Sequence, residues 1–341
     1  MNDRPLKSSE DSRTTLAEIV GEESLQGQRM QAGAILDLMD VAAGRAAFSH
    51  CGGQAVTLSF DRVDLIYPIH HQDLIRLEAE VALVGNSSML VHVQGYRRDA
   101  HTHSFTPIQS SYVTMVAIDG EGRPNANIPG LRHDTPHAET LRHRAQRIKS
   151  RAAEWQHMQE DASRLEPLRA ADVEETLNRA KSGTRLPEET EIEVRRVFLP
   201  RHNNQLGAIF GGDILLWMDR VATYSARSFT GNPHMVTIAM NRIFFKHPIF
   251  TTDLVDLVAR VVYVRNFTLE VEIEVQLQRL SGELLRSHTG YFTVLNHDQA
   301  GVKQPIPYGL ALRDSDQPAL RRYQQARLRH HFWETHRTDQ A

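Results

Sequence analysis

The sequence contains a single cysteine, Cys51, among 341 residues. One thiol cannot form an internal disulfide, which excludes a disulfide-stapled fold and is typical of a reducing compartment. The sequence also lacks any apolar run near the roughly 18 residues of a membrane span, and its polar beginning has no apolar core of signal-peptide length. We therefore expect a cytoplasmic protein without a membrane span.

The charge pattern also excludes some classes of partner. The formal net charge is −3, and no dense block of Lys and Arg occurs, so we do not expect nucleic acid as a partner. Histidine is abundant, with 18 residues, but its pairs follow no recognised ligand spacing, so we expect no metal site. These pairs are His70-His71, His101/His103 and His330-His331.

One stretch organises the chain: residues 204–219 read NQLGAIFGGDILLWMD. The residues from Ile214 to Ala226 are mostly good helix formers, and almost no face of this helix is consistently polar. Such a pattern predicts a buried helix. Asp219 lies within it, and a carboxylate in that position is costly unless it is paired or functional.

The same pattern occurs upstream, where residues 32–47 read AGAILDLMDVAAGRAA. Asp40 there matches Asp219 at an offset of 179 residues (219 − 40). Thr57 matches Thr237 at an offset of 180 (237 − 57), and this offset continues without a gap into the following strands. Matches of this length indicate an internal duplication.

Each copy of the long helix is followed by segments rich in β-branched and aromatic residues, separated by turn residues. One long helix followed by a run of strands predicts an α+β fold with an antiparallel sheet packed on the helix. We divide the chain into a polar leader, a first unit, a charged helical linker, a second unit and a basic, helical tail. Their ranges are 1–15, 16–131, 132–189, 190–310 and 311–341.

An ordered set of short motifs in the second unit resembles one family, the tandem double-hotdog acyl-CoA thioesterases. These motifs are Leu199-Pro200, Asn204, Phe210-Gly211-Gly212, Trp217-Met218-Asp219, Lys246-His247-Pro248 and Ile306-Pro307. The resemblance implies two hotdogs packed side by side, each a long central helix wrapped by a curved antiparallel sheet. It also implies a homo-oligomer, often a trimer of double hotdogs.

In that family the active sites lie between the hotdogs and combine an Asn from one with an acidic helix residue from the other. This pairing would join Asn204 with Asp40. The opposite pairing would use Asp219, but the position that matches Asn204 is Leu25, with Gln26 beside it. We therefore expect one competent site per chain.

The chemistry expected of this site is the hydrolysis of a fatty acyl-CoA to a fatty acid and CoA, without a cofactor. Asp40 would act as general base, or as a nucleophile that forms an anhydride, and burial would raise its pKa. Asn204 would orient the water or the carbonyl group. Backbone N–H groups at a helix start, near Gly33 or Gly211-Gly212, would stabilise the oxyanion.

Other residues are candidates for binding the CoA part of the substrate. Ser87 and Ser88 would touch the pantetheine arm, and Arg242, Lys246 and Arg265 would meet the phosphates. Each candidate also has a purely structural interpretation. The serines fit a strand turn, the basic residues fit ordinary surface charge, Asn204 fits a turn, and the two aspartates fit a wetter helix face or a structural pair.

Two other functions stay open. A hotdog hydratase or dehydratase acting on enoyl thioesters would need a paired His and acid, and no His occupies the matching helix positions. A catalytically silent acyl-CoA sensor is the other alternative, because the Asn is missing from one copy. A serine hydrolase is disfavoured, since the sequence has no Gly-x-Ser-x-Gly motif.

Overall fold

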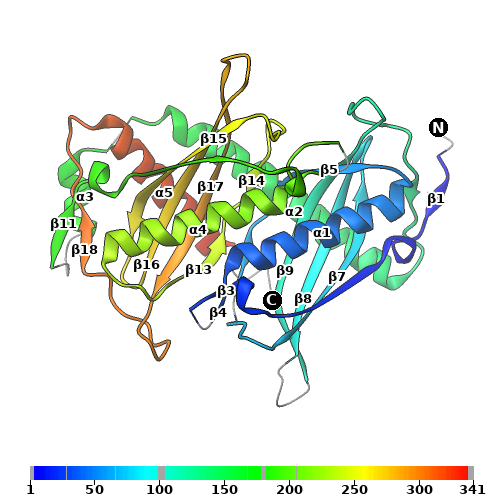
Figure 1. Cartoon of the computed structure of the whole chain (residues 1–341), viewed down its shortest axis with the longest axis horizontal. Helices are drawn as coiled ribbons and strands as arrows, with labels where there is room; N and C mark the ends of the chain where they lie inside the picture. The colour runs from blue at the N-terminus through cyan, green and yellow to red at the C-terminus, as the bar shows by residue number, and fades with distance from the viewer. Residues whose placement is uncertain are drawn as a thin grey trace.

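The computed structural model describes residues 4–27, 29–65, 67–98, 104–166, 168–177, 182–204 and 206–336. Two long helices, α1 (Ala32–Cys51) and α4 (Gly211–Thr230), lie near one another along the length of the molecule, each packed on its own curved sheet (Figure 1). Both helices end at a glycine with a positive φ, Gly52 or Gly231. This left-handed conformation closes a helix without strain only at glycine. No helix in the described part of the chain is long and apolar enough to cross a membrane.

Each helix is wrapped by an antiparallel sheet that has six strands among the described residues. The first sheet has the order β14 (Ile243–Phe244), β5 (Ala55–Phe60), β9 (Phe105–Ala117), β8 (Ser88–Arg98), β7 (Leu74–Val84) and β2 (Thr14–Ile19). The second has the order β12 (Ile192–Val197), β15 (Leu254–Val264), β16 (Thr268–Gln278), β17 (Leu284–Asn296), β13 (Met235–Met240) and β6 (Val63–Asp64).

The two sheets exchange a short strand. β6 follows β5 in sequence but pairs with β13 of the second sheet, and β14 pairs with β5 of the first. The helices also meet closely at their N-terminal ends. A Cβ at Gly33 would lie 2.6 Å from the Cα of Leu216, and a Cβ at Gly212 would lie 2.8 Å from the Cα of Asp37. Glycine is therefore required at both positions, where the helices cross. The predicted α+β double hotdog is confirmed.

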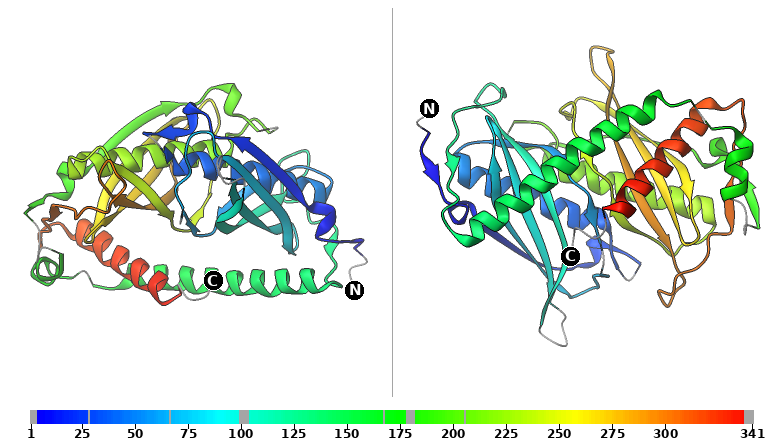
Figure 2. Two further views of the ribbon diagram at one scale, coloured as in Figure 1. Left: turned by 90° about the horizontal axis from the view of Figure 1, so that it is seen from below. Right: turned by 180° about the vertical axis from the view of Figure 1, so that it is seen from behind.

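Two further helices cover the outer faces of the sheets. α2 (Pro136–Arg164) runs across the back of both halves, and α5 (Gln317–Thr335) lies against the second sheet (Figure 2). Trp155 of α2 packs against the rings of Phe332 and Trp333 of α5, with centroids 5.4 and 5.2 Å apart. The segment between the hotdogs therefore buries apolar surface and also connects them. The other elements are α3 (Ala170–Leu177), β1 (Leu6–Lys7), β3 (Leu25–Gln26), β4 (Arg29–Met30), β10 (Gly130–Leu131), β11 (Gly183–Arg185) and β18 (Tyr308–Leu310).

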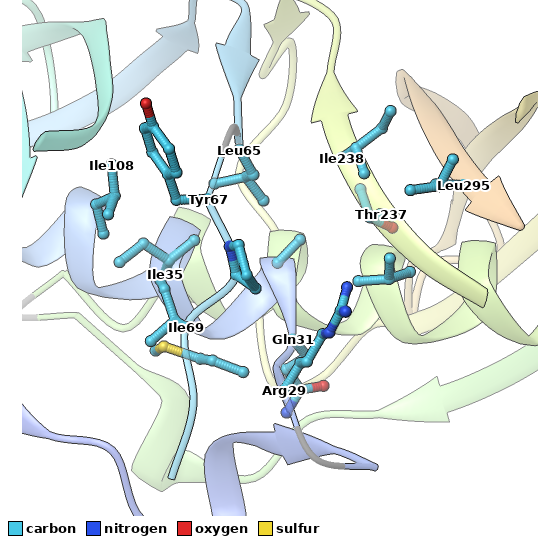
Figure 3. Close-up of a pocket in the computed structure, with 14 residues that line it drawn as sticks. Arg29, Gln31, Ile35, Leu65, Tyr67, Ile69, Ile108, Thr237, Ile238 and Leu295 are labelled. Atoms are coloured by element: carbon cyan, nitrogen blue, oxygen red, sulfur yellow. The ribbon is translucent and has the colours of Figure 1, made fainter. Parts of the chain in front are cut away.

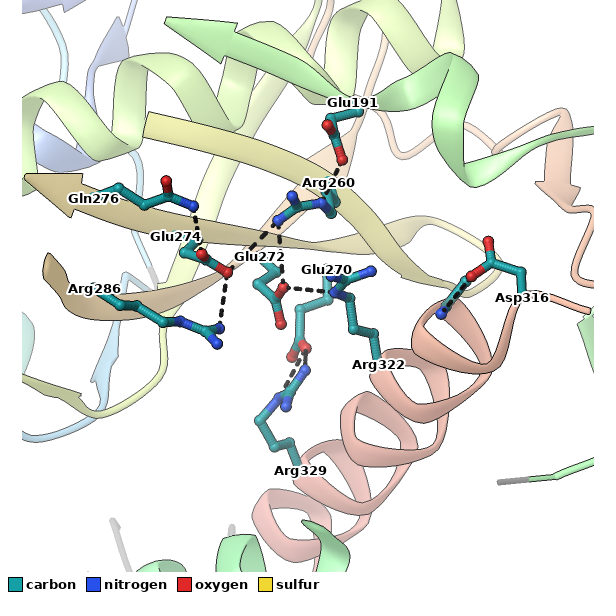
Figure 4. Close-up of polar contacts among 11 residues, drawn as sticks. Glu191, Arg260, Glu270, Glu272, Glu274, Gln276, Arg286, Asp316, Arg322 and Arg329 are labelled. Atoms are coloured by element: carbon teal, nitrogen blue, oxygen red, sulfur yellow. Dashed lines mark hydrogen bonds and ion pairs between the residues drawn. The ribbon is translucent and has the colours of Figure 1, made fainter. Parts of the chain in front are cut away.

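Ion pairs fix α5 on the second sheet (Figure 4). The guanidinium of Arg329 is fully buried and donates hydrogen bonds of 2.9 and 2.6 Å to Glu270 of β16. Arg322 of the same helix lies 3.2 Å from the carboxylate of Glu272. Breaking a buried pair by removing one partner leaves an uncompensated charge, so these contacts specify where the tail docks.

The N-terminal segment, expected to be a polar leader, packs against the first hotdog over its described part. Lys7 Nζ donates hydrogen bonds to the carbonyl groups of Ser49 and His50, at 3.0 and 2.9 Å. The hydroxyl of Ser12 accepts a 2.9 Å hydrogen bond from the N–H of Val81. The segment is held because Lys7 satisfies carbonyl groups that the last turn of α1 leaves free.

Candidate functional site

Asp40 lies in α1 and points at the first turn of α4. Its Oδ2 accepts a 2.8 Å hydrogen bond from the N–H of Gly212, and its Oδ1 accepts a 2.5 Å hydrogen bond from the hydroxyl of Thr57. Only 4% of Asp40 is exposed. Burial raises the pKa of Asp40, and the hydrogen bonds from Thr57 and Gly212 offset part of this effect.

The local sequence explains both contacts. Because α4 begins at Gly211, the N–H of Gly212 belongs to the first turn, where the helix itself supplies no acceptor and the helix dipole favours an anion. Thr57 lies at an irregularity of the β5–β9 ladder, and β13 repeats this irregularity at Thr237. Such a bulge redirects a side chain. In the sequence Thr57 marks only the duplication, and no local pattern there indicates its place beside Asp40.

Asn204 lies in the loop between β12 and α4, after the short helix η4 (Pro200–His202). Its Oδ1 accepts hydrogen bonds from the N–H groups of Leu206 and Ala208, at 2.9 and 3.2 Å. The side-chain oxygen therefore closes the loop. The Nδ2 group makes no hydrogen bond within the described residues, so it is the part of the amide available to another molecule.

A cavity of about 1220 Å³ joins these groups at the seam between the two halves. Asp40 and Thr57 of the first half line it, together with Asn204 and Gly211 of the second. The same cavity includes three of the expected binding residues, Ser87, Ser88 and Lys246. Much of the remaining wall is apolar, including Val41, Phe48, Met115, Ile214, Phe245 and Phe250.

Arg265, expected to bind CoA, lies elsewhere. It follows β15 near the tail helix, where its guanidinium is 3.2 Å from the carboxylate of Glu334. Arg242 is also outside the cavity wall and lies 3.3 Å from the carboxylate of Asp61. Both basic groups lie outside the cavity wall and have acidic neighbours on the protein, and the contact with the phosphates stays a prediction.

Asp219, like Asp40, accepts a hydrogen bond from the N-terminal turn of the other long helix. Its Oδ2 accepts a 2.8 Å hydrogen bond from the N–H of Gly33. Burial raises the pKa of Asp219, which is 0% exposed, and the neighbouring Thr237 and Gly33 lower it in part. Gly33 and Gly212 therefore serve to hold the two aspartates, and neither glycine lines the large cavity.

The surroundings of Asp219 differ from those of Asp40. The cavity on that side measures about 110 Å³ and includes Thr237 but not Asp219 (Figure 3). Arg29, which occupies the position of Ala208 in the other copy (208 − 29 = 179), lies along its wall. Gln26 faces the hydroxyl of Thr223, at 2.9 Å, instead of Asp219. This side therefore has Leu25 at the position that matches Asn204, and its cavity is smaller.

A second acidic group lies one turn before Asp40. The pKa of Asp37 is raised to about 6, mainly by burial and then by the negative charges of Asp213 and Asp40. Asp213, in the first turn of α4, lies 2.7 Å from Nδ1 of His202. This contact ties the loop that carries Asn204 to the start of the helix.

Two hotdogs joined at a seam, with a buried aspartate of each accepting a hydrogen bond from the helix N-terminus of the other, define a double-hotdog protein. The model of the thioesterase superfamily matches residues 30–102 and 206–280, which include both aspartates. An acyl-CoA thioester hydrolase of Bacillus subtilis, described as uncharacterized, is 33% identical over 134 residues, or 39% of this chain and 77% of that protein. The chain belongs to the thioesterase superfamily, as the resemblance implied.

Two further comparisons cover different shares of the chain. Acyl-coenzyme A thioesterase 11 of Mus musculus is 26% identical over 302 residues, which is 87% of this chain. The match is 48% of the mouse protein, so the chain spans about half the length of that relative. The acyl-CoA hydrolase of Staphylococcus aureus, solved with butyryl coenzyme A, is 30% identical with a TM-score of 0.41, over 44% of this chain and 92% of that one.

Proposed function

We propose that the chain is an acyl-CoA thioesterase that hydrolyses fatty acyl-CoA to a free fatty acid and CoA at the seam between its hotdogs. One observation carries the proposal. Asp40 of the first half shares a single cavity with Asn204 and Gly211 of the second, and its carboxylate is aimed at a helix N-terminus. The names of the relatives, which are thioesterases and thioester hydrolases, support the same chemistry.

Asp40 acts as the general base. It removes a proton from a water molecule while the water oxygen forms a bond to the thioester carbonyl carbon. Because burial raises the pKa of Asp40, the carboxylate is a better proton acceptor than an exposed aspartate. The hydrogen bond from Thr57 holds the carboxylate in one orientation.

The oxyanion that forms on the carbonyl oxygen needs preorganised donors. The N–H of Gly212 is occupied by Asp40, whereas that of Gly211 makes no hydrogen bond among the described residues and borders the cavity. We assign it, with Nδ2 of Asn204, to the oxyanion. A Cβ at Gly211 would lie 3.2 Å from Oδ2 of Asp40 and 3.5 Å from Cβ of Thr57, so a side chain there would fill the reaction space.

Collapse of the tetrahedral intermediate breaks the C–S bond and expels the CoA thiolate, which takes the proton that Asp40 removed from water. The alternative is attack by Asp40 itself, with a mixed anhydride as intermediate. A single turnover in ¹⁸O-labelled water distinguishes them. The general-base route places the label only in the fatty acid, whereas attack of water on the aspartyl carbonyl of the anhydride leaves the label in Asp40 and an unlabelled fatty acid.

Ser87, Ser88 and Lys246 remain the proposed contacts for CoA, because they line the same cavity as Asp40. The hydroxyl groups would meet the pantetheine arm, and the Lys246 ammonium group would meet a phosphate.

Outer strands β2 and β12 carry exposed apolar side chains, with Ile19 67% and Val197 54% exposed. We propose that such edges are covered in a homo-oligomer, for which a trimer predicts three times the chain mass in light scattering.

Release of free thiol from a panel of acyl-CoAs tests the proposed activity. We expect steady release by the wild-type chain and its loss in Asp40→Ala and Asn204→Ala. Tight binding of acyl-CoA without thiol release would instead identify a sensor. Hydration of an enoyl-CoA without thiol release would identify a hydratase.

A further inference from the structure

The cavity continues beyond Asp40 along one face of α1. Val41, Gly44 and Phe48 line it there, at helical spacing, and Arg45 lies beside them with its guanidinium carbon 5.4 Å from the centroid of the Phe48 ring. Eight residues separate Asp40 from Phe48, which is about 12 Å along a helix at 1.5 Å per residue. Phe48 is 40% exposed, so this groove opens towards solvent at its far end and has no wall of buried side chains there.

Gly44 keeps the middle of the groove open. It lies one turn after Asp40, and a Cβ built there would meet only the Cε of Met115, at 3.8 Å, within a radius of 4 Å. Glycine in the interior of a helix is unfavourable compared with alanine, and its φ here is that of an ordinary helix. Neither the backbone geometry nor packing within the chain therefore requires glycine at position 44, and its small size leaves empty space beside α1.

In the second half of the chain, polar side chains occupy the positions that correspond to this groove. Val41, Gly44 and Phe48 correspond to Arg220, Thr223 and Arg227, each 179 residues later. The hydroxyl of Thr223 lies 2.9 Å from the carboxamide of Gln26, whose oxygen accepts a 3.0 Å hydrogen bond from the Arg227 guanidinium. Nε of Arg220 donates a 3.1 Å hydrogen bond to Oε1 of Gln31. Polar side chains fill the space that is an apolar groove beside Asp40.

We propose that this groove of Val41, Gly44 and Phe48 holds the acyl chain, that Gly44 sets its width, and that the substrates are aliphatic acyl-CoAs of medium chain length or longer. The inference rests on the proposed hydrolysis. Hydrocarbon gains free energy when it leaves water for an apolar wall, and a chain of several methylenes spans the groove whereas an acetyl group stays beside Asp40. In the other half Thr223, Gln26 and Arg227 occupy the corresponding space and contact one another through polar groups, so that space offers a hydrocarbon chain no such wall.

A graded series tests the groove: Gly44→Ala, Gly44→Thr and Gly44→Leu, assayed for kcat/KM with acetyl-, butyryl-, octanoyl- and palmitoyl-CoA. We expect a progressive loss with octanoyl- and palmitoyl-CoA, roughly fourfold for each methylene that loses its apolar contact, and little change with acetyl-CoA. Thr223→Gly is the matched control in the other half, and it should leave all four rates at the wild-type level.

Acetyl-CoA turnover is the internal check on folding, and Gly44→Ala has room for its methyl group. An equal loss with all four substrates in Gly44→Ala would place the pantetheine arm in the groove and contradict the inference. Unchanged rates in Gly44→Leu would contradict it as well. If the wild type released no thiol, the proposed hydrolysis would be contradicted but the groove would not. The groove would then be tested by Kd, which Gly44→Leu should raise for palmitoyl-CoA but not for acetyl-CoA.

Discussion

The N–H of Gly212 donates a 2.8 Å hydrogen bond to the carboxylate of Asp40, which lies 172 residues earlier in the chain. Gly33 makes the same bond, also 2.8 Å, to Asp219. Each helix therefore begins against the acid of the other, and this reciprocal contact belongs to the fold. The two positions differ in what surrounds them, because Asp40 lines a cavity of about 1220 Å³ together with Asn204, whereas the cavity of about 110 Å³ on the other side includes Thr237 but not Asp219.

Replacing Thr57 by Val should shift the titration of Asp40. A hydrogen bond to the charged carboxylate lowers its pKa, so its loss raises the pKa of Asp40 further. The acid limb of the plot of kcat/KM against pH should therefore move to higher pH, with a loss of roughly 10-fold to 100-fold below that limb. Thr237→Val makes the same change beside Asp219 and should leave the profile unaltered. A Thr57→Val profile that coincides with the wild type would remove Thr57 from the site.

Two substitutions of Asn204 separate its structural contact from its chemical one. Aspartate keeps the oxygen that accepts the N–H groups of Leu206 and Ala208 but loses the NH₂ donor, whereas alanine loses both. We expect kcat/KM to fall by roughly 100-fold to 1,000-fold in both variants, with a lower Tm only in Asn204→Ala. Full activity in Asn204→Asp would reduce Asn204 to a loop-closing residue.

Asp37 should make the stability of the protein depend on pH. Its pKa is raised to about 6 from the ordinary 3.8, so its favourable contribution to folding is present below pH 4 and is lost as the pH rises through 6. Asp37→Asn removes that dependence, and the variant should exceed the wild type in Tm at pH 7 but not at pH 4. Thermal unfolding at the two pH values measures this. The same Tm difference at both would show that the charge of Asp37 is not responsible.

Much of the fold could be predicted because the duplication can be recognised in the sequence. The matched runs around Asp40 and Asp219 predicted two buried helices, and the unbroken offset through Thr57 and Thr237 predicted matching sheets. The absence of Asn from the first copy, at Leu25, also marked the asymmetry that the two cavities display. These signals are patterns among residues that lie close together in the sequence, so they can be recognised without the structure.

Other features depend on contacts between distant segments. The exchange of β6 and β14 follows from how the two sheets meet, and neither short strand has a distinguishing pattern. The partner of Arg265 is Glu334 of α5, and the position of that helix depends on the burial of Arg329 against Glu270. In the sequence Gly44 looks like any small residue of a helix, and only the structure shows the space beside it.

The central claim is that Asp40 performs the chemistry and Asp219 supports the fold. Asparagine at either position keeps an oxygen for the neighbouring N–H but removes the base. We expect Asp40→Asn to lower kcat/KM for palmitoyl-CoA by roughly 100-fold to 10,000-fold, and Asp219→Asn to stay near the wild-type value. An active Asp40→Asn variant together with an inactive Asp219→Asn variant would contradict the account.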